Sequence, residues 1–266
     1  MRAEIDLSAW SLRVADLIGT IDDAERLPGR MIDVLRAVAP AEIGYVTLNR
    51  AEHLPREISL YPKGYRHPHA WAEGLYVLDP LYQAYEAGLR GVCSLRQVMP
   101  TGFETTAYFQ RFYGRYGVVD EMLHAIDLPV GGSVFLGVVR GEEQGIFSRD
   151  DRARHEALHP VMVACAHRLA ELVADREDPA DRLKTLEVEC ALERFGAGEL
   201  TPRELDVIHL VLRGHNTESV ATQLAIAADT VKLHRKHAYA KLRVNSQGEL
   251  FFKFLESLGL DEQPGS

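Results

Sequence analysis

Apolar residues recur at every third or fourth position at both ends of the segment 1–175, which predicts helices there. The first pattern covers about Asp6 to Val38 and contains two helices, one on each side of IDDAERLPG. The last pattern runs from Ser148 to about Asp175, and the residues Ser148–Asp151 offer it an N-terminal cap. Between these helices the pattern changes.

The middle of the segment alternates between apolar and polar residues, as half-buried β-strands do. Ile43–Arg50 and Arg56–Pro62 are predicted to form one antiparallel pair. Asp120–Val130 and Gly132–Gly141 are predicted to form another, joined across Gly131-Gly132. We therefore expect at least four strands.

Two short helices are predicted between the strand pairs. One begins at Asp79-Pro80, with Asp79 as its N-cap, and runs to Gly88. The other covers roughly Thr105 to Tyr113. The resulting order, α-α-β-β-α-α-β-β-α, predicts an α+β domain with a central antiparallel sheet of four or five strands flanked by helices, the plan of GAF/PAS-like sensor domains.

The last quarter of the chain contains four short helical patterns, which predicts an all-α four-helix domain. Thr201 and Glu204 form a capping box at the start of the first helix, and Gly214 ends it. The second and third helices, about Thr217–Leu224 and Asp229–Arg243, are joined by a short link. Two short helices connected in this way, the second of them basic, are typical of a helix-turn-helix that enters the major groove of DNA.

The fourth helix begins with a second capping box, Ser246 to Glu249, and carries more apolar surface than so small a domain needs. A two-fold dimer contact accounts for that surface economically. Burial against the amino-terminal domain is the alternative. The residues predicted to form the dimer contact are Leu250, Phe251, Phe254 and Leu258.

A charged stretch that opens with Pro179 and ends in Gly196-Ala197-Gly198 separates the two parts and predicts a partly helical linker. We therefore expect a ligand-sensing α+β domain at 1–175, a linker at 176–198 and a helix-turn-helix DNA-binding domain at 199–266.

Charge is unevenly distributed along the chain. The net charge is −9, yet the tract from Thr230 to Lys253 has six basic residues and one acid, Glu249. A compact basic tract on an acidic body favours a local phosphate-binding surface. A solvated helix face is the alternative that charge alone leaves open.

Composition argues against several other classes of protein. The three cysteines lie in apolar patterns, as in a reducing compartment, and no apolar run approaches a membrane span, so we expect a cytoplasmic protein with no membrane partner. No nucleophile elbow, phosphate loop, HExxH or CxxC pair occurs, so we expect no catalytic residues, no cofactor and no metal. Asp120, Glu121 and His124 are interpreted as strand-edge residues.

Five motifs in the last quarter resemble one known family. They are LTPRE, VIHLVLRG (Val207–Gly214), VATQLAI (Val220–Ile226), TVKLH (Thr230–His234) and KLRV (Lys241–Val244). In this order they resemble the LuxR/FixJ/GerE-type helix-turn-helix domain. The resemblance implies a transcriptional regulator that binds double-stranded DNA as a homodimer, with RNA polymerase as a further candidate partner.

The resemblance also implies roles for individual residues of the third helix. Lys232, Leu233 and Lys236 would face the groove, and Thr230, Arg235 and Lys241 would lie near phosphates. The sequence departs from the family at Glu218-Ser219, Ala227 and Gln247, where a Lys-Glu pair, a Ser cap and an Arg are usual. Because two phosphate contacts would be missing, we expect DNA affinity to fall only gradually with rising salt.

The amino-terminal domain concentrates its aromatic residues, since eight of the ten tyrosines lie between Tyr61 and Tyr116. Such a cluster is typical of a selective small-molecule pocket, although packing in the core is the alternative. The residues predicted to bind an unknown small-molecule effector are Trp71, Tyr76, Asp79, Tyr82 and Tyr108.

An α+β domain followed by a LuxR-type domain also resembles the acyl-homoserine-lactone receptors, in which an Asp-Pro like Asp79-Pro80 holds the ligand amide. That family carries aromatic residues where this chain has Arg66 and Ala70, and near Ser94. We therefore expect a different small ligand. The other readings are a lactone-type quorum-sensing receptor and a ligand-independent regulator whose front domain docks a protein partner.

Overall fold

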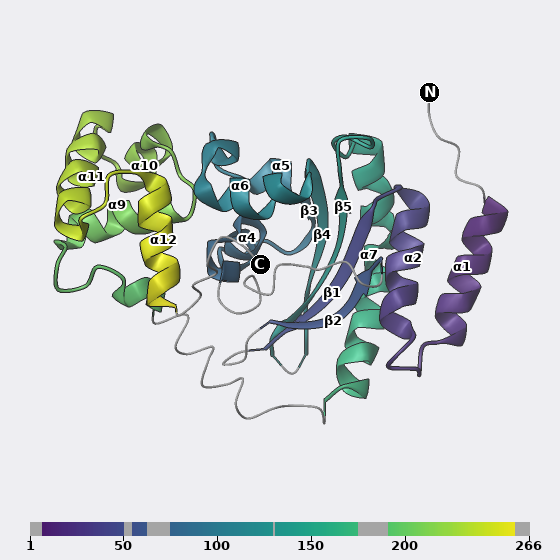
Figure 1. The fold of residues 1–266 in the computed structure, drawn as a ribbon. Coiled ribbons are helices and arrows are strands. Elements are labelled where there is room, and N and C mark those ends of the chain that lie inside the picture. The colour runs from purple at the N-terminus through teal and green to yellow at the C-terminus, as the bar shows by residue number, and fades with distance from the viewer. Residues whose placement is uncertain (1–6, 51–54, 63–74, 130, 175–190, 259–266) are drawn as a thin grey trace, which may run out of the picture.

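The computed structural model describes residues 7–50, 55–62, 75–129, 131–174 and 191–258. Within these ranges the chain forms an α+β domain built on one sheet, and a group of helices at its carboxy-terminal end (Figure 1). The predicted fold class is confirmed. No helix among the described residues combines the length and apolar character that a membrane crossing requires.

The sheet has five strands in the order β2-β1-β5-β4-β3, and every neighbouring pair is antiparallel. Both predicted strand pairs are confirmed. The edge strand β3 was not predicted, because its four residues, GVCS, are too few to show an alternating pattern. The strands are β1 (Ile43–Asn49), β2 (Arg56–Tyr61), β3 (Gly91–Ser94), β4 (Asp120–Asp127) and β5 (Ser133–Arg140).

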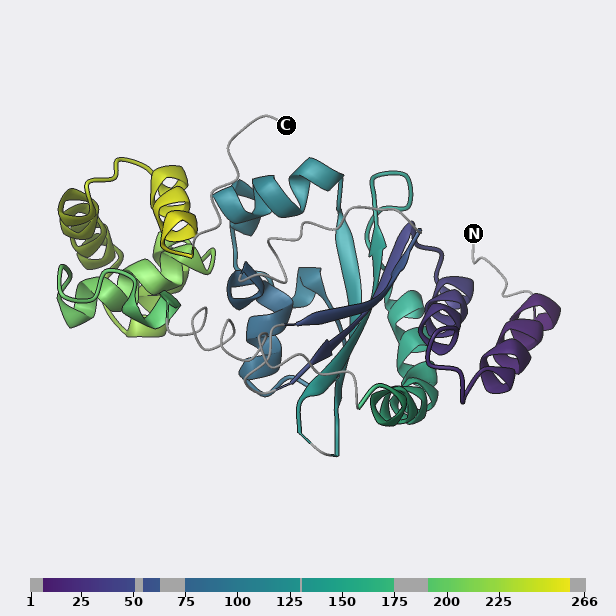
Figure 2. The same ribbon diagram turned by 60° about the horizontal axis from the view of Figure 1, so that its bottom comes forward.

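Helices cover the two faces of the sheet in separate layers (Figures 1 and 2). One face carries α2 (Leu27–Val38) and α7 (Arg149–Leu172), with α1 (Leu7–Gly19) packed outside α2. The other face carries short elements and faces the carboxy-terminal helices. These are η1 (Leu75–Leu78), α4 (Pro80–Glu86), α5 (Leu95–Val98), η2 (Phe103–Thr105), α6 (Ala107–Phe112) and η3 (Gly114–Tyr116).

Strand β4 is internal, because β3 pairs along its outer side. The prediction that Asp120, Glu121 and His124 are strand-edge residues is therefore wrong, and all three side chains are buried. Alternate residues of a strand point to opposite faces. His124 accordingly reaches His155 and His159 of α7, at 2.9 and 3.1 Å between ring nitrogens, while Glu121 faces the other side.

The carboxy-terminal domain, called the reader below, contains four helices among residues 200–258: α9 (Pro202–Leu212), α10 (Thr217–Leu224), α11 (Ala228–Leu242) and α12 (Gln247–Ser257). The capping box of Thr201 and Glu204 is confirmed, and so is the Ser246 cap of α12. Leu192 and Phe195 also pack into this unit, since the ring of Phe195 lies 5.4 Å from that of Phe254.

Candidate DNA-binding and ligand-binding sites

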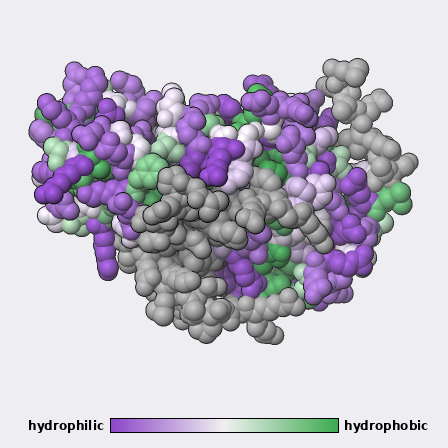
Figure 3. Space-filling view, in the orientation of Figure 1, coloured by the Kyte–Doolittle hydropathy of each residue, from purple (hydrophilic) through white to green (hydrophobic). Residues whose placement is uncertain are grey.

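Helix α11 divides into a buried face and a solvent face, as a recognition helix must. Val231, Ala238 and Leu242 are buried. Leu233, an apolar residue, is 51% exposed, and Lys232 and Lys236 are exposed beside it. Most of the surface at the left end of Figure 3, where Figure 1 places α11, is hydrophilic. The predicted groove-facing residues thus share one accessible surface.

The residues predicted to lie near phosphates are in different environments. Thr230 and Arg235 are half-buried on α11. Lys241 is exposed, and its Nζ donates to Glu204 Oε2 at 2.6 Å. Together with the Thr201 backbone amide, this lysine lowers the pKa of Glu204 to about 2. The Lys241 ammonium therefore holds α11 to the start of α9.

Acidic groups lie next to the basic face of α11. Lys232 donates to Asp229 at 2.9 Å, and this contact raises the pKa of Lys232, with a smaller contribution from Glu218. Asp229 thus pairs with Lys232, and Ala227, the N-cap residue of α11, makes no side-chain cap. Gln247, where the family usually carries Arg, donates to the Val211 carbonyl at 3.0 Å.

In the amino-terminal domain, called the sensor below after the role predicted from its sequence, Asp79 lies at the centre of a buried polar cluster. Its Oδ1 accepts from the Leu81 and Tyr82 amides at 2.8 and 3.3 Å, so it caps α4 as predicted. Its Oδ2 accepts from the hydroxyls of Tyr108 and Tyr113 at 3.1 and 2.8 Å. Burial, followed by the charge of Asp79, raises the pKa of Tyr113.

A second buried carboxyl group, Glu121, lies on the same side of the sheet and accepts from the Tyr45 hydroxyl. Gly137 makes this contact possible, since a Cβ there would overlap the Tyr45 ring. Burial raises the pKa of Glu121 to about 8, and the charge of Asp79 adds to that effect. We call Asp79, Glu121, Tyr45, Tyr108 and Tyr113 the acid–tyrosine cluster.

The structure brings together four of the five residues that the sequence predicted to bind a ligand. Tyr108 contacts Asp79, and the ring of Tyr76 lies 4.8 Å from that of Tyr82, next to the Asp79 cap. Trp71 lies outside the described residues. Sequence reasoning missed Tyr45, Tyr113 and Glu121. The available signal was Glu121 itself, an acid that shares its strand face with the buried apolar residues Leu123 and Ala125.

The apolar face of α12 is covered by the chain itself. Leu250, Phe251 and Phe254 are buried, and Leu258 is half-buried. Phe251 packs against α6, with ring centroids 6.3 Å from Tyr108 and 6.5 Å from Phe112. In this arrangement of the domains the chain itself covers these side chains, so a dimer contact through them remains a prediction. The alternative, burial against the amino-terminal domain, holds for Phe251, because α6 supplies an aromatic surface that complements it.

A second contact joins the domains at the turn between α9 and α10. Gly214 has a φ of 85°, and a Cβ there would lie 2.7 Å from Phe103 Cδ2. The Phe103 ring therefore packs on the glycine backbone. Through Phe103 and Phe251, the aromatic layer around the acid–tyrosine cluster is continuous with the core of the reader.

Comparison with known proteins identifies the family. The model of bacterial regulatory proteins of the luxR family matches residues 198–253. An HTH-type transcriptional regulator from the exeN 3′ region of Aeromonas salmonicida is 36% identical over 189 residues, covering 68% of this chain and 94% of that protein. This chain belongs to the LuxR family of transcriptional regulators. It is accordingly a DNA-binding regulator and not an enzyme.

Two further similarities cover one domain each. The nitrate/nitrite response regulator NarP of Escherichia coli is 39% identical over 72 residues, which are 25% of this chain and 34% of NarP. The crystal structure of the VqsR LBD domain from Pseudomonas aeruginosa matches 64% of this chain and 99% of its own, with a TM-score of 0.55 and 22% identity. The amino-terminal domain therefore has the fold of that domain.

Proposed function

We propose that this regulator binds DNA as a homodimer and that a small molecule bound at the acid–tyrosine cluster controls its binding. The reader inserts the solvent face of α11 into the major groove, with Lys232, Leu233 and Lys236 against the bases and Thr230 and Arg235 near phosphates. The domain limits proposed for this division of labour are 1–175, 176–198 and 199–266.

One observation carries the proposal of ligand control: Tyr108 contacts both halves of the molecule. Its hydroxyl donates to Asp79, and its ring packs on Phe251 of α12. A ligand that replaces Tyr108 as a hydrogen-bond donor to Asp79 changes the position of Tyr108. It thereby alters the surface against which Phe251 of α12 packs. Since Phe251 is an apolar side chain suited to a dimer contact, its release couples ligand binding to pairing of two readers.

The ligand class follows from the groups that the cluster offers. Two carboxyl groups and three tyrosine hydroxyls favour a ligand that carries hydrogen-bond donors, and the surrounding rings favour an apolar portion. The VqsR domain that shares this fold is an LBD, in agreement with a sensing role for the amino-terminal domain.

The test of DNA binding uses the full chain and duplexes selected from a random pool. The double variant Lys232→Ala/Lys236→Ala is expected to reduce affinity at least tenfold, because it removes two cationic contacts on α11. Arg149→Ala, which removes an exposed charge of the sensor domain, is the matched control and is expected to change affinity less than twofold. Equal losses in the two variants would contradict the assignment of α11.

The salt dependence of the same binding reaction tests the composition of the contact surface. We expect a shallow slope, because Glu218 and Gln247 stand where the family carries basic residues and Lys241 is engaged with Glu204. A steep slope, of the kind made by eight or more phosphate contacts, would contradict this prediction.

Ligand control is tested by mass spectrometry of small molecules released from the purified protein, followed by DNA-binding and oligomer measurements with the released compound. We expect the compound to change both the DNA affinity and the monomer–dimer ratio of the native protein. In the Tyr113→Phe variant we expect it to change neither. DNA binding that is indifferent to every released compound would favour a ligand-independent regulator, and a released lactone would identify a quorum-sensing receptor.

A further inference from the structure

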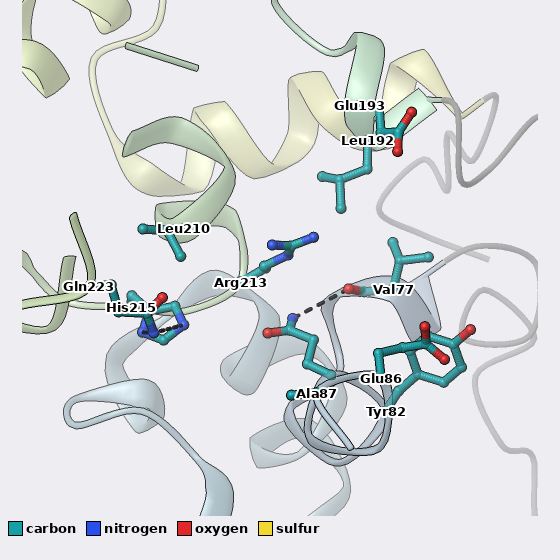
Figure 4. A pocket seen from close by; sticks show the side chains of 11 residues that line it. Val77, Tyr82, Glu86, Ala87, Leu192, Glu193, Leu210, Arg213, His215 and Gln223 are labelled. Atoms are coloured by element: carbon teal, nitrogen blue, oxygen red, sulfur yellow. Dashed lines mark hydrogen bonds between the residues drawn. The ribbon is translucent and has the colours of Figure 1, made fainter. Parts of the chain in front are cut away.

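A cavity lies between the two domains, and none of the described residues that line it belongs to the acid–tyrosine cluster (Figure 4). Its volume is about 560 Å³, within the range of roughly 300–1,000 Å³ that small-molecule sites occupy. The sensor contributes η1 and α4, through Val77, Gln83 and Glu86 among others. The reader contributes side chains around the end of α9 and from α10. A molecule bound here touches both domains at once.

Arg213 lines this cavity, and its buried Nε has no hydrogen-bond partner among the residues that the structure describes. It follows α9 directly, and its guanidinium extends between Leu192 on one side and Val77 on the other (Figure 4). Its Nε is buried and makes no hydrogen bond, and no ion pair links Arg213 to any residue that the structure describes. Burial alone lowers its pKa.

Among the described residues, no acidic side chain forms an ion pair with Arg213. His215 lies on the same wall, and its pKa is lowered by burial and then by the charge of Arg213. An arginine kept charged in a partly dry site is costly unless an anion or a hydrogen-bond acceptor meets it. Since the guanidinium fork matches a carboxylate in two-point geometry, a carboxylate is the group that would satisfy it best.

Acidic groups on the same cavity narrow the choice of ligand. Glu86 and Glu193 line it from opposite domains, and both are exposed to solvent. They disfavour a ligand with several negative charges and favour one with a positive or donor group at the end remote from Arg213. The amides of Gln83 and Gln223 offer additional polar contacts.

We propose that this interdomain cavity binds a small zwitterion of amino-acid or dipeptide size, with its carboxylate on Arg213 and its ammonium toward Glu86 and Glu193. Because the ligand contacts both domains, its binding stabilises the docked arrangement in which Phe251 is covered. The site thus gives the regulator a second input, which acts on the domain interface and does not require the acid–tyrosine cluster.

The test screens the full-length protein by thermal unfolding against the twenty proteinogenic amino acids and glycylglycine, with acetate and ethylammonium as single-headed controls. At least one zwitterion is expected to raise the unfolding temperature, and both controls are expected to leave it unchanged. The strongest probe is then titrated by calorimetry into the native protein and its variants. Failure of every probe to bind overturns the proposal.

The variants separate this site from its surroundings. Arg213→Met is expected to weaken binding of the probe by about 10- to 100-fold, the loss typical of one charge-assisted pair. Arg194→Met makes the same change at an exposed arginine that does not line the cavity and is expected to bind normally. If Arg213→Met does not fold, Arg213→Lys keeps the charge without the fork, and tenfold weakening is expected.

Two outcomes of these titrations contradict the assignment. Equal affinity in Arg213→Met and Arg194→Met would show that the guanidinium is not the carboxylate site. Weakening by Tyr113→Phe without weakening by Arg213→Met would place the probe at the acid–tyrosine cluster. Weakening by Arg213→Met without weakening by Tyr113→Phe would support the interdomain site, whether or not the acid–tyrosine cluster binds a ligand.

Discussion

Each domain buries a glutamate, and the surroundings shift the pKa values of the two carboxyl groups in opposite directions. In the reader, Glu204 accepts from the Thr201 amide and from the Lys241 ammonium, and its pKa falls to about 2. In the sensor, Glu121 has the Tyr45 hydroxyl as its hydrogen-bond partner and the charge of Asp79 nearby, and its pKa rises to about 8. The first carboxylate is compensated, whereas ionisation of the second is opposed.

The difference indicates that Glu204 has a structural role, whereas Glu121 belongs to a candidate binding site. Glu204 satisfies a helix start and fixes α11 to α9, so its ionised form stabilises the reader at neutral pH. Glu121 has no such benefit from ionisation, and an apolar residue would fill its place on β4 at lower cost. Groups of this kind are retained where binding needs them, which favours the sensor cluster as the place where a ligand acts.

The largest effect is expected from Asp79→Ala, since Asp79 makes four hydrogen bonds that tie α4 to Tyr108 and Tyr113. Leaving two buried hydroxyls without their acceptor and removing the helix cap is expected to lower the free energy of unfolding by about 3–5 kcal/mol. Urea unfolding at pH 7 measures it. Asp79→Asn, which keeps an acceptor, should lose less than half as much, and equal losses would argue against this network.

A smaller loss is expected from Glu204→Gln, about 1–2 kcal/mol at pH 7, because the amide cannot form the charged contact with Lys241. The folded pKa of about 2 lies below the ordinary value of 4.5. The stabilisation is therefore complete above about pH 4.5 and is lost as the pH falls toward 2. Urea unfolding from pH 3 to 7 should show the native protein and the variant converging at low pH.

Lys241→Met is the control for this pair. It removes the other partner and should reproduce most of the loss at pH 7. A stability difference between Glu204→Gln and the native protein that stayed constant down to pH 3 would contradict the ionic origin of the effect.

Glu121→Gln is expected to raise the stability at alkaline pH, in contrast to Glu204→Gln. The folded pKa of about 8 lies above the ordinary 4.5, so the native protein loses stability as the pH rises between these values. The glutamine variant lacks that loss, so its stability relative to the native protein is expected to increase as the pH rises from 4.5 to 8. Parallel stability profiles of the two proteins would contradict the raised pKa. Tyr45→Phe, which leaves Glu121 in place, should keep the pH dependence.

The same contrast explains what the sequence could predict. In the reader the decisive contacts are local: Thr201 with Glu204, and Ser246 with Glu249, lie three residues apart, and such spacing is visible in a sequence. The Asp79 cap of α4 is of this kind and was predicted as well. Local chemistry also gave both strand pairs.

The remainder depends on contacts between distant segments, which a single sequence does not display. Glu121 meets Tyr45 across a separation of 76 residues, and Tyr113 meets Asp79 across 34. Phe251 was correctly recognised as surplus apolar surface, but its partner on α6 depends on how the domains pack, which periodicity does not encode. The N-cap of α11 is an intermediate case. The sequence shows that Ala227 cannot provide a side-chain cap, but it does not show how much this lowers the stability of the reader.

The smallest predicted effect concerns that cap. Ala227 occupies the N-cap of α11 with extended backbone and no side-chain hydrogen bond, so Ala227→Ser can accept from an amide of the first turn without rearrangement. We expect the free energy of unfolding of the reader to rise by about 0.5–1 kcal/mol in urea unfolding. Ala240→Ser, an exposed position inside the same helix, is the matched control and should lower stability by about 0.5 kcal/mol. An increase in stability in both variants, or in neither, would show that the missing N-cap does not limit the stability of the reader. The comparison between the two domains would then depend only on Glu204 and Glu121.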